Sequence, residues 1–214
     1  MNAATQNAAR LAADARLLFS NARWPTAASV AALSIEEAGK VVILRRFLTA
    51  SDEEIRALWK DYRSHTRKNV NWILPDLIAG GARKLDDFRS MVDKDAEHPF
   101  LLDTLKQLGF YSDRLGAAHW SIPSEVIESD LAEQLVRTAE LLSPKRSISI
   151  RELELWVKNM KPVWKGVAIW DDQRRALADW YADMQREGLA PAGNNHMEAF
   201  VNGGLTISQA LKQV

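Results

Sequence analysis

The chain has 214 residues, of which 47% are hydrophobic, and its 28 basic side chains balance its 28 acidic ones. A chain of this size can bury one sizeable core. Its zero net charge excludes a general electrostatic attraction to nucleic acid. Because it has no cysteine, disulfides and thiolate zinc sites are excluded as well. No apolar run approaches the roughly 20 residues that span a bilayer, and the N-terminal residues lack the apolar segment of a secretory signal, so we expect a cytoplasmic protein with no membrane association.

Apolar residues recur at helical spacing through the first half of the chain. We predict an alanine-rich amphipathic helix over residues 3–19 and a second helix over residues 25–48. Pro25 can open the second helix because the first helical position needs no N–H donor. A capping-box pattern opens a third predicted helix over residues 51–73, which we expect Pro75 and then Gly80-Gly81 to end.

The second half of the chain is divided by proline and glycine into shorter helical segments. Residues 81–98 are expected to form a loop with one helical turn. The remaining predicted helices cover residues 99–113, 124–142, 149–160, 171–187 and 206–214. Because no alternation of period two persists, the sequence predicts an all-α fold.

Residues 27–44 carry only three charged side chains, and these stand where apolar residues are expected. Glu37 falls on a stripe of valines and leucines, and Glu36 lies on the neighbouring stripe. One interpretation is an exposed Glu36–Lys40 ion pair, and the other is a polar centre inside a helix bundle. His65 lies on the apolar stripe of the next predicted helix, so the second interpretation places Glu37 opposite His65. As a structural residue, His65 would bond Glu36 or Glu37.

Motifs for metal and cofactor chemistry are missing from the sequence. A di-iron bundle needs Glu-x-x-His on two helices, but no glutamate stands three residues before any of the four histidines. The sequence also lacks a P-loop, a dinucleotide fingerprint and a nucleophile elbow. We therefore expect neither a metal nor a cofactor.

Three sequence blocks in a fixed order together resemble one known family. The blocks are SIEEAGK over residues 34–40, Tyr62-Arg-Ser-His65-Thr-Arg-Lys68, and Tyr111-Ser-Asp113 through Trp120 to Pro123. Their order and spacing over residues 5–125 resemble the AbiV family of abortive-infection proteins, which belongs to the HEPN superfamily. The resemblance implies a HEPN-like antiparallel helix bundle over residues 1–125, with residues 126–214 as a helical C-terminal extension packed on the bundle.

The resemblance also implies an activity. HEPN domains are usually dimeric, and many are metal-independent ribonucleases with an Arg-x4–6-His motif, which Arg114 and His119 match. Histidine would take the proton of a ribose 2′-OH, and arginine would stabilise charge on the phosphate. Two functions stay open: an anti-phage abortive-infection ribonuclease that shuts down translation, and a non-catalytic dimeric defence adaptor that binds a phage protein.

The resemblance and the residue pattern together nominate partners and site residues. The expected partners are a second copy of the chain, RNA and a phage-encoded activator protein. Eight tryptophans favour the homodimer, because tryptophan is enriched at interfaces. The catalytic candidates are His65, Arg114, His119 and Glu37, with the choice between the two histidines open. The binding candidates are Glu36, Lys40, Arg63, Lys68, Tyr111 and Asp113.

Overall fold

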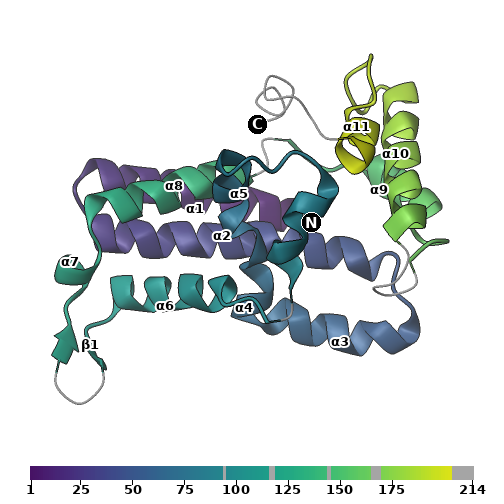
Figure 1. The fold of residues 1–214 in the computed structure, drawn as a ribbon. Coiled ribbons are helices and arrows are strands. Elements are labelled where there is room, and N and C mark those ends of the chain that lie inside the picture. The colour runs from purple at the N-terminus through teal and green to yellow at the C-terminus, as the bar shows by residue number, and fades with distance from the viewer. Residues whose placement is uncertain (94, 116–118, 144–145, 165–169, 204–214) are drawn as a thin grey trace.

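The computed structural model describes the chain except residue 94 and residues 116–118, 144–145, 165–169 and 204–214. Helices build the described part of the molecule and confirm the predicted all-α fold (Figure 1). Among the described residues the one sheet is a hairpin of two short antiparallel strands, β1 (Asp113–Leu115) and β2 (His119–Ser121), where no strand was predicted. None of the described helices is both long and apolar enough to cross a membrane.

The main bundle has α2 at its centre. Its members are α1 (Asn2–Ser20), α2 (Trp24–Phe47), α6 (His98–Phe110) and α8 (Ser129–Leu142). α2 packs against the other three helices, and α1 and α6 run antiparallel to it (Figure 1). Alanines line the α1–α2 contact: Ala12 and Ala15 of α1 and Ala28 and Ala31 of α2 are buried in one core cluster. Their small side chains let the two backbones lie close together.

The bundle core continues past residue 125, where the resemblance places the domain boundary. Ile127 and Leu135 are buried in the same core cluster as Ala31 and Leu102. α8 therefore belongs to the bundle core, and we propose that the boundary to the C-terminal extension lies after Leu142.

The predicted continuous helix over residues 51–73 is wrong, because the helix breaks at Ser64. α3 (Asp52–Arg63) ends there, and Ser64 has extended backbone angles, φ −78° and ψ 130°. Its Oγ accepts a hydrogen bond from the backbone N–H of Arg67 at 3.4 Å and caps a new one-turn helix, α4 (His65–Lys68). Serine side chains compete for backbone donors in this way and favour helix starts over helix interiors.

Three short elements lie between α4 and α6. They are the 3₁₀ helix η1 (Val70–Ile73), the helix α5 (Leu74–Ala79) and the 3₁₀ helix η2 (Leu85–Val92). Pro75 does not end a helix as predicted, whereas Gly80 lies at the C-terminal end of α5, where a helix end was predicted. Pro75 lies in the first turn of α5, where proline sacrifices no hydrogen bond. η2 supplies the helical turn predicted within residues 81–98.

The C-terminal part of the chain contains four more helices among the described residues. They are α7 (Pro123–Val126), α9 (Ile150–Met160), α10 (Trp170–Arg186) and α11 (His196–Asn202). α9 and α10 match predicted helices, α7 is separated from α8 where one helix was predicted, and α11 was not predicted. The helix predicted over residues 206–214 lies outside the described residues. A second core cluster, Leu155, Trp180 and Met184, joins α9 to α10 at the C-terminal end of α2 (Figure 1).

Candidate functional site

Glu36 on α2 is the centre of a buried ionic cluster. Only 3% of its surface is exposed, and its two carboxylate oxygens contact different helices. Oε1 accepts a hydrogen bond from Lys106 Nζ of α6 at 2.5 Å, and Oε2 accepts one from His65 Nδ1 of α4 at 2.8 Å. The Lys68 ammonium of α4 lies 3.8 Å from Oε2. One carboxylate therefore joins α2, α4 and α6.

Contacts between α2 and α6 hold Lys106 in place. Its backbone carbonyl accepts a hydrogen bond from Ser29 Oγ at 2.8 Å, and its ammonium also lies 2.7 Å from Asp103 Oδ1. A Cβ on Gly109 would lie only 2.3 Å from Ser29 Oγ. Glycine at this position therefore lets α6 approach α2 closely enough for Lys106 to reach Glu36.

Gly39 lets α4 approach α2 closely, as Gly109 does for α6. A Cβ on Gly39 would lie 2.0 Å from the carbonyl oxygen of Lys68. The backbone of α4 packs directly on α2 because no side chain stands between them. His65 and Lys68, at the two ends of α4, both reach Glu36 from this position.

Gly39→Ala is expected to lower the free energy of unfolding by up to about 2 kcal/mol. The overlap with the α4 backbone costs about 1–3 kcal/mol and exceeds the gain of about 1 kcal/mol that alanine brings to a helix interior. Urea unfolding followed by circular dichroism measures the difference. Gly80→Ala is the control, because a Cβ at that helix end would come no closer than 3.2 Å to the carbonyl oxygen of Asp76 and 3.5 Å to that of Leu77. Equal stabilities of the two variants would contradict the close approach.

Burial and charge act differently on the two lysines of the cluster. Burial lowers the pKa of Lys68, and the attraction of Glu36 offsets only part of this effect because no hydrogen bond joins the two groups. Burial also disfavours the Lys106 ammonium, but its hydrogen bonds with Asp103 and Glu36 outweigh burial and raise the pKa of Lys106. Lys106 is therefore a permanent cation of the cluster.

Glu37 does not face His65, so that prediction is wrong. Glu37 forms an ion pair with Lys40 one turn along α2, and the Lys40 ammonium lies 5.8 Å from the centre of the Tyr62 ring. The exposed Glu36–Lys40 pair is not formed either. The buried stripe of α2 is the alanine-rich one that carries Glu36, because neighbouring helices approach most closely over small side chains. His65 bonds Glu36, one of the two partners that the sequence left open.

The Arg-x4–6-His match lies on the hairpin rather than in the ionic cluster. Arg114 pairs with Trp120 and Leu115 pairs with His119 in the register of β1 and β2, and Asp113 begins β1. The hairpin extends past the C-terminal end of α6, whereas α4 lies beside the opposite end of that helix (Figure 1). Within a single chain, Arg114 and His119 on the hairpin therefore do not join His65 in one site.

The last two binding candidates have exposed side chains. Tyr111 lies between α6 and β1 and contacts the Phe110 ring, with 6.1 Å between ring centres. Arg63 ends α3, where its Nε donates a hydrogen bond to the Trp59 carbonyl oxygen at 3.2 Å. Neither residue contacts Glu36.

Lys106 and Asp103 are members of the cluster that the sequence analysis missed. A signal was available, because Leu102, Lys106 and Gly109 follow each other at helical steps of four and three, and all three are buried. A lysine within a buried stripe requires a carboxylate partner. The same rule that drew attention to Glu36 and Glu37 would have found it.

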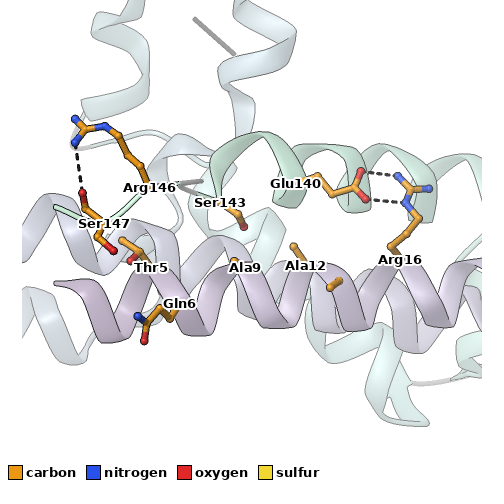
Figure 2. Close-up of a pocket in the computed structure, with 10 residues that line it drawn as sticks. Thr5, Gln6, Ala9, Ala12, Arg16, Glu140, Ser143, Arg146 and Ser147 are labelled. Atoms are coloured by element: carbon orange, nitrogen blue, oxygen red, sulfur yellow. Dashed lines mark hydrogen bonds and ion pairs between the residues drawn. The ribbon is translucent and has the colours of Figure 1, made fainter. Parts of the chain in front are cut away.

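A surface groove runs between α1 and α8, apart from the ionic cluster (Figure 2). It encloses about 670 Å³, and small side chains such as Ala9 and Ala12 form part of its wall. At one end Arg16 donates two hydrogen bonds to Glu140, at 2.8 and 2.7 Å, and Arg146 lines the groove as well. The groove shares no residue with the cluster around Glu36.

Glu140→Gln is expected to lower stability at pH 7 by less than about 1 kcal/mol, because the ion pair is partly exposed. The Arg16 hydrogen bonds lower the pKa of Glu140, so their stabilisation is present above the unfolded value of about 4.3 and is lost as pH falls through the folded value. Thermal unfolding of both proteins should therefore differ at pH 7 and coincide near pH 2. A difference that persists at pH 2 would contradict the ion pair as its cause.

The sequence model of the AbiV family of HEPN domains matches residues 1–143, which is more than half of the chain. The chain belongs to the AbiV family. This membership indicates an abortive-infection protein. No curated protein and no solved structure matches the chain.

Proposed function

We propose that this chain is an anti-phage abortive-infection protein that cleaves RNA without a metal ion, acts in the cytoplasm and uses His65 as its base. The observation that carries the proposal is the 2.8 Å hydrogen bond between Glu36 and His65. The carboxylate is buried, whereas 59% of the imidazole side chain is exposed. A histidine held from behind by a carboxylate, with its other nitrogen open to solvent, is the arrangement of a general base.

The proposed chemistry follows from the two nitrogens of His65. Because an ionised carboxylate only accepts hydrogen bonds, Nδ1 carries the proton and Nε2 has the free lone pair. Nε2 takes the proton of a ribose 2′-OH, and the oxygen attacks the adjacent phosphorus. The bond from phosphorus to the 5′-oxygen of the next nucleotide breaks, and that oxygen takes a proton from water, so that the products are a 2′,3′-cyclic phosphate and a 5′-hydroxyl.

Cations beside His65 would hold the phosphate. Lys68 lies on the same helical turn, and its ammonium has no hydrogen bond of its own with Glu36. Because Lys68 is only 6% exposed, it would stabilise the charge that develops during attack through its positive field, from behind the imidazole. Lys40 and Arg63 are proposed to contact the backbone of the RNA on either side. We propose that Arg114 and His119 act at a second RNA contact, on the hairpin.

The test is cleavage of labelled RNA in the presence of EDTA, with analysis of the product ends. Wild type is expected to cleave and to leave cyclic phosphate ends. His65→Ala is expected to lose at least about a hundredfold in rate, as removal of a general base does. His119→Ala tests the alternative histidine, and His196→Ala on α11 is the control. Full activity of His65→Ala in folded protein would assign the base elsewhere, and no cleavage by wild type would favour the adaptor.

The alternative, a non-catalytic dimeric adaptor that binds a phage protein, is favoured by a different observation. Large apolar side chains are exposed where α6 ends and the hairpin begins: Phe110, Tyr111, Trp120 and Ile122, with Trp120 70% exposed. Aromatic side chains of this kind are typical of interface cores. We propose that this surface supports a homodimer in either function. Light scattering of wild type and of Trp120→Ser tests the homodimer.

A further inference from the structure

The ionic cluster also contains a grouping of three potential metal ligands, of which the proposed reaction leaves Asp103 unused. Glu36, His65 and Asp103 each offer one ligand atom, and the three atoms lie within 4.8 Å of one another. Two carboxylate oxygens and an imidazole nitrogen form a common donor set for a divalent metal ion. Zinc holds such ligands at about 2.1 Å, so two ligands of one ion lie at most about 4 Å apart. The observed set is only slightly wider.

A cation already lies against this set. Lys106 Nζ is 2.5 Å from Glu36 Oε1 and 2.7 Å from Asp103 Oδ1, so it contacts two of the three members. Its side chain is almost fully buried, and the hydrogen bond from Ser29 to its backbone fixes its place on α6. The buried Glu36 carboxylate, with the half-buried Asp103 carboxylate beside it, needs a compensating positive charge, and the ammonium provides it.

We propose that Lys106 is the built-in cation of a three-ligand set formed by Glu36, Asp103 and His65, and that it occupies the place of a divalent metal ion. Lys106 is a positioning residue in this assignment. By binding Oε1, its ammonium fixes the Glu36 carboxylate so that Oε2 faces His65 Nδ1. The same ammonium repels a metal ion from the set. The inference concerns the resident cation and does not depend on RNA cleavage.

The consequence is that removal of the lysine charge should open a metal site. Lys106→Met keeps the length and apolar stem of the side chain and removes the cation. We expect this variant to bind one Co²⁺ per chain, a coloured ion that accepts the same ligands as Zn²⁺. Binding followed by calorimetry and by the absorption of the bound Co²⁺ should be at least about tenfold tighter than for wild type.

Two ligand deletions and one control make the test specific. In the Lys106→Met background, Asp103→Asn and His65→Gln should each weaken Co²⁺ binding at least about tenfold. Lys40→Met is the matched control, because it removes a lysine that pairs with Glu37 outside the set. It should bind Co²⁺ no better than wild type.

Three results would overturn the inference: Co²⁺ binding by Lys106→Met no tighter than by wild type, binding that survives both ligand deletions, or equal binding by Lys40→Met. If Lys106→Met is unfolded without metal, Co²⁺ is expected to restore its helical circular dichroism, and failure to do so would also overturn the inference. Because no readout uses RNA, the result is independent of whether the chain is a ribonuclease.

Discussion

Glu36→Ala is expected to lower the free energy of unfolding by about 3–5 kcal/mol. Removal of one member of a buried ion pair leaves the remaining charge without compensation, which costs this amount. Here the substitution removes the shared acceptor of Lys106 and His65 and the nearest carboxylate of Lys68. Asp103 remains for Lys106, but Lys68 has no other carboxylate within 4 Å among the described residues. Urea unfolding at pH 7, followed by circular dichroism, measures the loss.

Two glutamates provide matched controls for this substitution. Glu37→Ala removes the neighbouring carboxylate, which pairs with Lys40 alone, and it should cost clearly less than Glu36→Ala. Glu133→Ala removes an exposed partner of Arg137 on α8 and should cost less than about 0.5 kcal/mol. If Glu36→Ala and Glu37→Ala are equally stable, Glu36 is not the centre of a buried cluster.

Arg45→Met is expected to cost about 3 kcal/mol and to loosen the C-terminal helices from the bundle. Arg45 lies near the end of α2, and its guanidinium is 5.0 Å from the Trp156 ring and 5.7 Å from the Trp180 ring. It also lies 3.4 Å from the fully buried carboxylate of Glu152. Burial lowers the pKa of Arg45, which Glu152 partly offsets. Loss of two desolvated cation–π contacts accounts for most of the expected cost, because Arg146, which lies 2.7 Å from Glu152, still pairs with it in the variant.

The neighbouring arginine is the control for this substitution. Arg46 is more exposed and lies 3.6 Å from Asp61, so Arg46→Met should cost less than about 1 kcal/mol. Tryptophan fluorescence should change on Arg45→Met, since the cation sits over two tryptophan rings, and should not change on Arg46→Met. Equal effects of the two substitutions would show that Arg45 does not hold the extension.

Helical periodicity was sufficient to predict the long helices, because α1, α2, α9 and α10 lie where apolar spacing and proline placed them. Helical periodicity failed at Ser64, where the side chain accepts a hydrogen bond from the backbone of Arg67 and the continuous helix is interrupted. The spacing of apolar residues alone cannot predict such a helix cap. The hairpin escaped prediction because its strands are too short to establish an alternating pattern.

The sequence placed a polar centre on α2, but it set Glu37 opposite His65, whereas the structure has Glu36 there. Valine and leucine were taken to mark the buried stripe of α2, whereas the tightest packing runs over alanine and Gly39. Hydrophobicity ranks Val above Ala, but the distance between helices depends on side-chain size. Gly39 and Gly109 allow α4 and α6 to approach α2 because they have no Cβ. Their effect can be recognised only when the position of the facing backbone is known.

The bridge between Glu36 and Lys106 also bears on the order of folding. The two residues are 70 positions apart in sequence, whereas α1 and α2 follow each other directly. Pairs of helices that are neighbours in sequence form quickly. Contacts between distant segments form more slowly, because closing the long loop between them costs conformational entropy. During synthesis, α1 and α2 can therefore pair before Lys106 has been made. Until α6 docks, hydration of the carboxylate keeps this face of α2 open and opposes its burial against an incorrect partner.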